Sequence, residues 1–241
     1  MSEDFGRVQN YYDEFSQTYE SARHEGYHLL IDELEIACIQ DYVAGKKVLE
    51  AGCGTGLILN VVNLLAEEAI GIDLSPGMLT LARNKGLNVQ QASITEIPFE
   101  NETFDIVYSF KVLAHVKDIK KAVSEMARVT KPGGVLVLEF YNKKSIRYIV
   151  KKTKKPTKTS DKFTDEQVYT RYDTLKDIKS YLEPGLKVEK LQGVRIFTPF
   201  AFVHKIPLVK SIYTHLERKF RDSKLAKYGG FLVVTIRKED V

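Results

Sequence analysis

The stretch Val48-Leu-Glu-Ala-Gly-Cys-Gly-Thr-Gly56, a short apolar run that ends in three closely spaced glycines, decides the fold. The apolar run over residues 47–51 predicts a buried strand, and the apolar pattern from Leu57 onward predicts a helix. Glycines between a strand and a helix allow a tight turn and let backbone N–H groups approach a ligand. The stretch therefore predicts a strand–loop–helix unit with a ligand site at its loop.

The spacing of the glycines bears on the kind of ligand. The dehydrogenase fingerprint is G-x-G-x-x-G, whereas Gly52, Gly54 and Gly56 form G-x-G-x-G, with Leu57 at the place of the third fingerprint glycine. No Lys-Ser or Lys-Thr pair follows, which excludes a P-loop. Glu50 precedes the loop, and its carboxylate would attract an ammonium group and repel a pyrophosphate. An enzyme of dinucleotides or nucleotide sugars stays open as an alternative.

Strands and helices alternate after this loop. Strands are predicted over residues 69–74, 89–92, 104–109 and 135–140, and helices over 57–67, 76–85 and 119–129, with a turn at 131–134. Helices are also predicted over 11–19 and 29–43, and two later strands, 186–191 and 230–237, flank a mostly helical segment, 197–227. Such alternation, with strands apolar on both faces, indicates a parallel doubly wound α/β sheet covered by helices on either side.

The composition is that of a globular protein that needs no covalent cross-links. Two cysteines, Cys38 and Cys53, are too few for a disulfide scaffold or a four-cysteine zinc site, and no metal site is expected. A net charge of +4 gives no indication of a nucleic-acid partner. No apolar run approaches the length of a membrane span, and the acidic, aromatic N-terminus is not typical of a signal peptide. A cytoplasmic location is expected.

A second polar motif, Gly71-Ile-Asp-Leu-Ser-Pro-Gly-Met78, lies at the end of the next predicted strand. The carboxylate of Asp73 can accept hydrogen bonds from both hydroxyls of a ribose. Capping the following helix is the other interpretation, but Ser75 is better placed for that role. The motif therefore favours a nucleoside site at Asp73.

Taken in order, these motifs resemble those of the class I S-adenosylmethionine-dependent methyltransferases. The family's Leu-Pro-Phe-like element, Phe-Asp-x-Val strand and Lys-Pro-Gly-Gly turn recur at Ile97–Phe99, Phe104–Val107 and Lys131–Gly134, and the resemblance covers residues 45–141. Ser109-Phe110, His115-Val116 and Val137–Phe140 further resemble the quinone-methylating branch, whose other signatures are absent. The resemblance implies a Rossmann-like sheet of seven strands in the order 3-2-1-4-5-7-6, with strand 7 antiparallel.

The resemblance also implies how the chain is organised. Residues 1–44 would form an N-terminal helical cover, and residues 45–142 would form the cofactor-binding core. Residues 143–185 would form a basic insertion or lid after the fifth strand, and residues 186–241 would complete the sheet.

S-adenosylmethionine is the implied cofactor, and S-adenosylhomocysteine the product. By resemblance, Glu50, Gly52, Cys53 and Gly54 would line the methionine moiety, Asp73 would hold the ribose, Leu74 and Met78 would enclose the adenine, Ser93 and Ile94 would meet its edge, and Tyr19 and Ser109 would complete the set. The family often has Gly-Asp-Ala where this chain has Ala92-Ser93-Ile94, so a hydroxyl stands in place of a carboxylate. Cys53 is expected to pack against the cofactor rather than to act as a nucleophile.

Methyl transfer from a sulfonium is an in-line displacement, which needs alignment and exclusion of water more than acid–base help. His115 is a candidate base, and a cap or packing role is the other interpretation. Tyr11 is the second catalytic candidate, and Tyr11, Tyr19 and Arg23 are candidates for holding the methionine carboxylate, with ordinary packing left open. Lys111 is a second polar candidate beside His115, and the favoured interpretation is that it is solvated.

The acceptor is expected to be a small molecule, or a peptide or lipid-linked group, methylated at O, N or C. The chain lacks the Asp/Asn/Ser-Pro-Pro-Tyr motif of nucleobase-amine methylases and the double-Glu loop of arginine methylases. Residues 143–158 carry eight Lys or Arg and no acid, which indicates an anionic acceptor, an anionic membrane surface or a solvated loop. A non-catalytic cofactor-binding or partner-binding protein on the same scaffold stays open.

Overall fold

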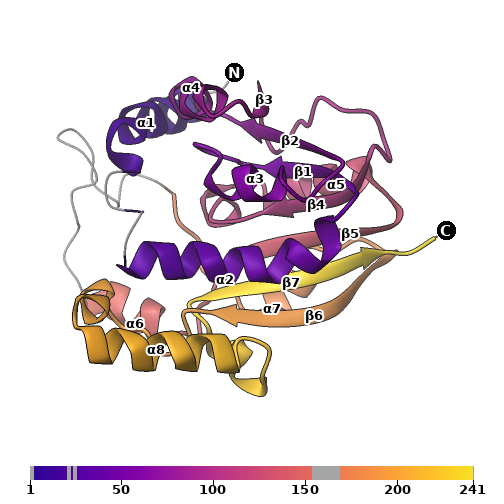
Figure 1. Cartoon of the computed structure of the whole chain (residues 1–241). Helices are drawn as coiled ribbons and strands as arrows, with labels where there is room; N and C mark the ends of the chain where they lie inside the picture. The colour runs from indigo at the N-terminus through magenta and orange to yellow at the C-terminus, as the bar shows by residue number, and fades with distance from the viewer. Residues whose placement is uncertain (1–2, 21–22, 24–25, 154–168, 241) are drawn as a thin grey trace.

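A seven-stranded sheet runs through the middle of the molecule in the computed structural model, which describes residues 3–20, 23, 26–153 and 169–240 (Figure 1). The strands are β1 (Lys47–Ala51), β2 (Glu68–Asp73), β3 (Asn88–Gln91), β4 (Phe104–Ser109), β5 (Thr130–Tyr141), β6 (Leu186–Val194) and β7 (Phe231–Lys238). Their order is β3-β2-β1-β4-β5-β7-β6. The first five strands are parallel to one another, whereas β7 is antiparallel to both β5 and β6. The predicted fold class is confirmed.

Helices and 3-10 turns connect the strands. The α-helices are α1 (Glu3–Tyr19), α2 (Gly26–Val43), α3 (Leu57–Val62), α4 (Pro76–Asn84), α5 (Ile119–Val129), α6 (Ile146–Thr153), α7 (Leu175–Lys179) and α8 (Pro207–Phe220). The 3-10 helices are η1 (Leu113–His115), η2 (Ala201–Lys205) and η3 (Lys224–Tyr228). None of the described helices is both long and apolar enough to cross a membrane.

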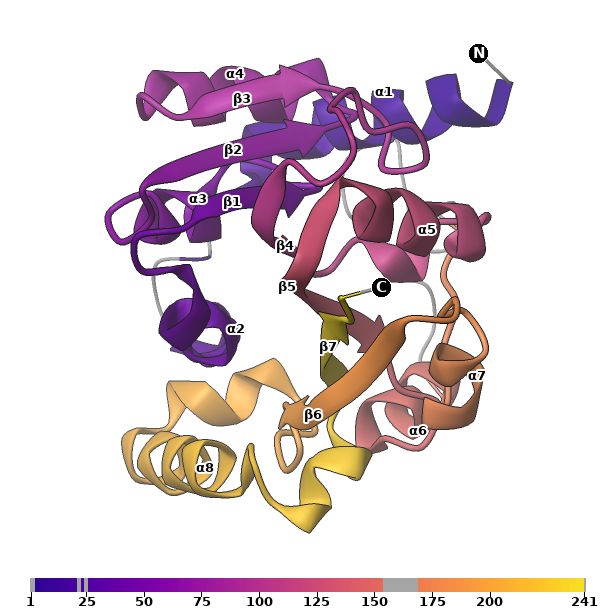
Figure 2. The ribbon, with the colours of Figure 1, turned by 90° about the vertical axis from the view of Figure 1, so that its right-hand side faces the viewer.

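The core has two halves, one on each face of the sheet. Successive strand residues point to opposite faces, so Val48 joins the cluster under α2 and α3, whereas Leu49 joins the cluster under α5 and α7. Figure 2 shows α2, α3 and α8 on one side of the sheet and α5 and α7 on the other. Because both faces are covered, the central strands are mostly apolar on both faces, as the sequence indicated.

Several segments differ from the sequence-based prediction. Helix α1 begins at Glu3 rather than at residue 11, and helices α6 and α7 were not predicted. The helix from Leu57 ends at Val62, turns follow over residues 63–66, and the backbone N–H groups of Glu67 and Glu68 then donate to the Lys46 carbonyl where β2 begins. Residues 131–134 are not a separate turn but lie within β5, where the pairing with β4 shifts and Gly133 has a φ of 69°. The segment 197–227 contains one α-helix, α8, flanked by the two short helices η2 and η3.

The insertion after β5 returns to the end of that strand. Asp173 N donates to the Tyr141 carbonyl at 2.7 Å, and Lys143 N donates to the Asp173 carbonyl at 3.0 Å. Arg171 N donates to the Ala114 carbonyl at 2.8 Å, which joins the insertion to the loop after β4. Part of the basic run, residues 154–158, lies outside the described residues.

Candidate active site

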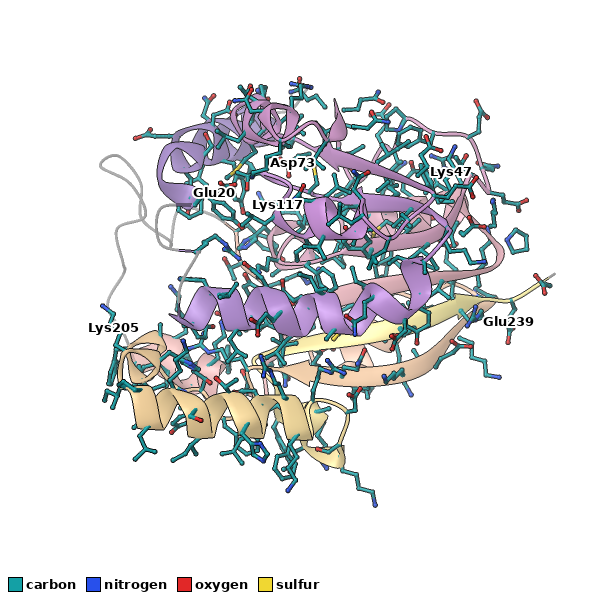
Figure 3. All side chains as sticks on the ribbon, viewed as in Figure 1. Glu20, Lys47, Asp73, Lys117, Lys205 and Glu239 are labelled. Atoms are coloured by element: carbon teal, nitrogen blue, oxygen red, sulfur yellow. The ribbon has the colours of Figure 1, made fainter. Side chains whose placement is uncertain are left out.

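A cavity of about 1340 Å³ opens at the carboxyl ends of β1, β2 and β4. Its wall comes from the loops that follow these strands and from α1, which lies beside α4 (Figures 1 and 2). Figure 3 shows two of its lining residues, Asp73 and Lys117, close together and well away from Lys47, where β1 begins. Ligands of doubly wound sheets bind at this edge.

The glycine loop after β1 has a backbone that side chains would not tolerate. Gly52, Gly54 and Gly56 have φ angles of 85°, 53° and 77°. A Cβ on Gly52 would come within 2.3 Å of a Val112 methyl carbon, and one on Gly56 would come equally close to Leu87 Cδ1. The loop therefore needs glycine both for its dihedral angles and for its close packing.

Glu50 places a buried carboxyl group in the wall of the cavity. It is paired with Tyr108 across β1 and β4, and the Tyr108 hydroxyl donates to Glu50 Oε2 at 2.9 Å. Only 3% of Glu50 is exposed. Burial raises the pKa of Glu50 to about 8, although the Tyr108 hydrogen bond opposes this shift. Without a cationic partner, the side chain is therefore mostly protonated at neutral pH.

Asp73 ends β2 and uses both carboxylate oxygens locally. Oδ2 accepts Gly54 N at 2.8 Å, and Oδ1 accepts Ser75 N at 2.9 Å. Burial raises the pKa of Asp73, while these two backbone N–H groups favour the ionised form. A carboxylate oxygen can accept more than one hydrogen bond, so each retains capacity for a further donor. Ser75 caps α4 by accepting Met78 N, as predicted from the sequence.

Beyond Asp73, the cavity wall includes a group of apolar and uncharged polar side chains. Leu74, Met78, Ser93 and Ile94 all line the cavity, and Met78 is buried. The Ser93 hydroxyl lies 2.8 Å from the hydroxyl of Thr95, and Thr95 N donates to Ser93 Oγ at 3.2 Å. Thr95 also lines the cavity, but nothing in the sequence singled it out.

Helix α1 covers the cavity with aromatic side chains and is fixed through one aspartate. Tyr11, Tyr12 and Tyr19 line the cavity. Asp13 Oδ1 accepts hydrogen bonds from the Ser75 hydroxyl at 2.5 Å and from Gly77 N at 2.8 Å. The first turn of α4 therefore holds α1 over the site.

His115 lies on η1 at the cavity wall, next to the insertion. Its Nδ1 is 2.9 Å from the Tyr169 carbonyl oxygen. Because a carbonyl can only accept, Nδ1 carries the proton, and in the neutral ring Nε2 keeps its lone pair. Burial lowers the pKa of His115. The N-cap of α5 is Asp118, so His115 is not the cap that one interpretation allowed.

The sequence-based prediction of a solvated Lys111 was wrong. Its Nζ lies 2.7 Å from both Asp32 Oδ1 and Glu35 Oε2 on α2, and its backbone has a φ of 62°. Burial acts to lower the pKa of Lys111, but the Glu35 and Asp32 carboxylates outweigh it and raise the pKa. Lys111 N donates to Glu139 Oε1 at 3.1 Å. Ion pairs therefore hold the loop after β4.

Arg23 also pairs with Asp32, so that Arg23, Lys111, Asp32 and Glu35 form one cluster of charged side chains. Its Nη2 is 2.6 Å from Asp32 Oδ1, and its guanidinium carbon lies 4.6 Å from the centre of the Tyr19 ring. Arg23, Asp32 and Lys111 all line the cavity. Among the described atoms, the buried Arg23 Nε has no hydrogen-bond partner. The sequence held a signal for this ion-pair cluster, since Asp32 and Glu35 interrupt the apolar residues of α2.

Ser109 and Cys53 differ in their relation to the cavity. Ser109 is fully buried, its hydroxyl donates to the Ala51 carbonyl at 2.7 Å, and it is not among the described lining residues. Ser109 thus ties β4 to β1 beneath the site. Cys53 does line the cavity, and its Sγ packs over Gly71, where a Cβ would lie 2.7 Å away. Burial raises the pKa of the Cys53 thiol, which disfavours the thiolate.

The chain matches known proteins over both its core and its full length. Residues 49–138 match the family model described as a methyltransferase domain. An uncharacterised protein of Methanocaldococcus jannaschii is 30% identical over 247 aligned residues, which cover 95% of this chain and 91% of that protein. Demethylmenaquinone methyltransferase of Tropheryma whipplei is 37% identical over 99 residues, about two fifths of each chain.

The solved structure of an S-adenosylmethionine-dependent methyltransferase from Thermotoga maritima has the same fold. Its TM-score is 0.63 at 17% identity, with 93% of this chain and 98% of that chain covered. The chain belongs to the class I S-adenosylmethionine-dependent methyltransferases. Its cofactor is S-adenosylmethionine, and S-adenosylhomocysteine is the product. The dinucleotide and non-catalytic alternatives are thereby set aside.

The cavity has groups that suit this cofactor. The cofactor carries an ammonium and a carboxylate at one end and a ribose in its middle. Glu50 offers a buried carboxyl group, Arg23 an unpaired N–H, and Asp73 two oxygens with remaining acceptor capacity. Among the described residues, no cluster of three or more potential metal ligands occurs.

Proposed function

We propose that this enzyme methylates an O, N or C atom of a small lipophilic or anionic metabolite by in-line displacement. The observation that carries the proposal is that one cavity contains Glu50, Asp73 and a histidine with an available Nε2. When bound, the cofactor supplies a methyl group already activated on a sulfonium. The protein then has to bind the acceptor, align it with the methyl group and exclude water.

The positions of the side chains in the cavity support a set of proposed cofactor roles. We assign Glu50 to the ammonium, Arg23 to the carboxylate and Asp73 to the ribose hydroxyls. The loop backbone at Gly52, Cys53 and Gly54 would lie along the methionine part, and Tyr19 would cover it. Leu74, Met78, Ser93 and Ile94 would surround the adenine. Ser109 supports this site from beneath rather than touching the cofactor.

His115 is proposed as the base when the acceptor must lose a proton. Its Nδ1 is occupied by the Tyr169 carbonyl, so Nε2 is the atom that would take the proton. The lowered pKa keeps the ring neutral at physiological pH, as a base requires. Tyr12 lies against the ring, with centroids 6.4 Å apart. Tyr11 is a further candidate for contact with the acceptor.

The aromatic character of the cavity wall supports a flat or lipophilic acceptor. Tyr11, Tyr12, Phe110 and Tyr169 all line the cavity. The similarity to demethylmenaquinone methyltransferase, which covers about two fifths of the chain, also supports a flat or lipophilic acceptor. In this proposal, residues 1–44 cover the cofactor and residues 143–185 contribute to the acceptor side, next to His115.

Screening for methyl transfer from isotopically labelled S-adenosylmethionine tests the proposal. Acceptor panels of phenols, quinols, carboxylates and amines are incubated with wild-type protein and with Asp73→Ala, and products are read by mass spectrometry. We expect a labelled product from a lipophilic or anionic acceptor that Asp73→Ala fails to form. Cofactor binding without turnover of any such acceptor, but with methylation of a peptide or nucleic acid, would refute it.

A further inference from the structure

Helix α8 lies at the outside of the molecule and buries little of itself. Within the described residues of this helix, only Glu217 is buried. Its carboxylate accepts the backbone N–H groups of Ile196, Phe197 and Thr198 at 2.7–2.9 Å. Attachment through this carboxylate leaves the outer face of α8 to the solvent.

Large apolar side chains gather where η2 leads into α8. Phe202, Ile206, Leu208 and Ile212 are 58%, 50%, 74% and 51% exposed. Leu208 and Ile212 are four residues apart on the helix and therefore project from the same side. Exposed apolar side chains that cluster in this way mark an interaction site more often than chance exposure does.

The charged side chains of the same segment have one sign. Residues 201–221 contain five Lys or Arg and a single acid, Glu217, which is buried. Among the described residues, Lys205 and Lys210 have no ion-pair partner. Helix α6, which also has no buried residue and ends in Lys151 and Lys152, lies at the same lower end of the molecule in both views (Figures 1 and 2).

We propose that Phe202, Lys205, Ile206, Leu208 and Lys210, here called the η2–α8 surface, bind an anionic lipid bilayer. An amphipathic helix at a bilayer places its apolar residues at the acyl boundary and its lysines among anionic headgroups. A second copy of the chain docked through the same surface would instead place these lysines against the same lysines of the other copy, where like charges repel. Figure 3 shows Lys205 projecting from the outer margin of the molecule, where it can reach such a surface. The inference does not depend on the proposed acceptor.

Co-sedimentation of the full-length protein with lipid vesicles tests the proposal. Vesicles of phosphatidylcholine alone are compared with vesicles in which a third of the lipid is phosphatidylglycerol. The apolar variant is Phe202→Ser with Leu208→Ser, and the charge variant is Lys205→Glu with Lys210→Glu. Leu64→Ser and Lys120→Glu are the controls, since they remove an exposed leucine and an exposed lysine elsewhere on the surface.

The wild-type protein should bind only the anionic vesicles, and added salt should weaken binding. Each double variant should lower the partition coefficient about tenfold or more, and the controls should leave it unchanged. Circular dichroism and retained S-adenosylhomocysteine binding would show that the variants are folded. Absence of wild-type binding, or equal binding by folded double variants, overturns the proposal. So does a concentration-dependent dimer that only the double variants abolish, since a second copy would then occupy the surface.

Discussion

Cofactor binding should depend on pH through Glu50. In the free protein, burial raises the pKa of Glu50 to about 8, but pairing with the ligand's ammonium requires the carboxylate. Below that pKa, binding must therefore release a proton from Glu50. The ammonium itself stays protonated at these lower pH values, because α-amino groups titrate near pH 7.7–8.0. The affinity should thus fall about tenfold for each pH unit well below 8.

Isothermal titration with S-adenosylhomocysteine between pH 6 and pH 8 measures this effect. Repeating the titration in buffers with different ionisation enthalpies counts the released proton directly. Methylthioadenosine, which lacks the ammonium and carboxylate, serves as the ligand control, and its affinity should not follow the same slope. Glu50→Gln should remove the slope and weaken S-adenosylhomocysteine at pH 8 by about tenfold or more.

The same substitution should stabilise the protein without ligand. A carboxyl group whose pKa is raised by folding makes the folded state less stable as the pH rises from 4.5 to about 8. Glutamine has no such titration and can keep the bond from the Tyr108 hydroxyl, so Glu50→Gln should gain about 3 kcal/mol of unfolding free energy at pH 7. A wild-type affinity that is flat from pH 6 to pH 8, or a destabilised Glu50→Gln protein, would refute the reasoning.

Four further substitutions probe the rest of the site. Asp13→Ala removes the acceptor that fixes α1 over α4, and we expect titration to show S-adenosylhomocysteine binding weakened about tenfold. With an active acceptor found, His115→Gln should lower kcat but not cofactor affinity. The wild-type kcat should fall as the pH drops through the lowered pKa of His115, below 6.5, because protonation removes the lone pair at Nε2. Lys111→Met leaves the buried Glu35 carboxylate without a cation and Asp32 with Arg23 alone, so urea unfolding should show a loss of about 3 kcal/mol. Gly56→Ala places an alanine at a positive φ and brings its Cβ against Leu87. Thermal unfolding should therefore show a lower Tm, from a loss of about 1–3 kcal/mol of unfolding free energy.

Each of these expectations has an outcome that contradicts it. Unchanged binding by Asp13→Ala would mean that α1 is held by its aromatic contacts alone. A pH profile that His115→Gln shares with the wild type would remove His115 as the base. Wild-type stability in Lys111→Met would show that the acids of α2 are neutral already, and Lys120→Met on the exposed face of α5 is the matched control for the loss of a lysine. A Tm unchanged in Gly56→Ala would show that the glycine loop can relax around a methyl group.

The cofactor loop and the central strands could be predicted because their signals are local, whereas the strand order was predicted from the resemblance to a known family. The glycine spacing at 52–56, the acid at Asp73 and the apolar strands each reflect a backbone or a contact within a few residues. Their order along the chain then follows the family pattern. Element ends were harder to predict: the helix from Leu57 was expected to reach residue 67, but it ends at Val62 and passes into turns before β2.

The polar network around Lys111 could not be predicted, since its partners lie far away in sequence. Asp32 and Glu35 come from α2, and only the packing of α2 on the sheet brings them to the loop after β4. A solvated lysine is the more common outcome for such a position, which explains the wrong prediction. Ser109 was likewise assigned to the cofactor set, but its hydroxyl faces the Ala51 carbonyl within the sheet.

The single buried carboxylate of α8 has a consequence for how the enzyme can change over time. Glu217 attaches the helix to the rest of the protein, because its carboxylate accepts three backbone N–H groups that would otherwise lack a hydrogen-bond partner. Substitutions on the outward-facing residues of α8 then leave the core and the methyl-transfer cavity untouched. If the η2–α8 surface binds a bilayer as proposed, its affinity for lipid can therefore be changed by substitution without altering the residues of the cavity.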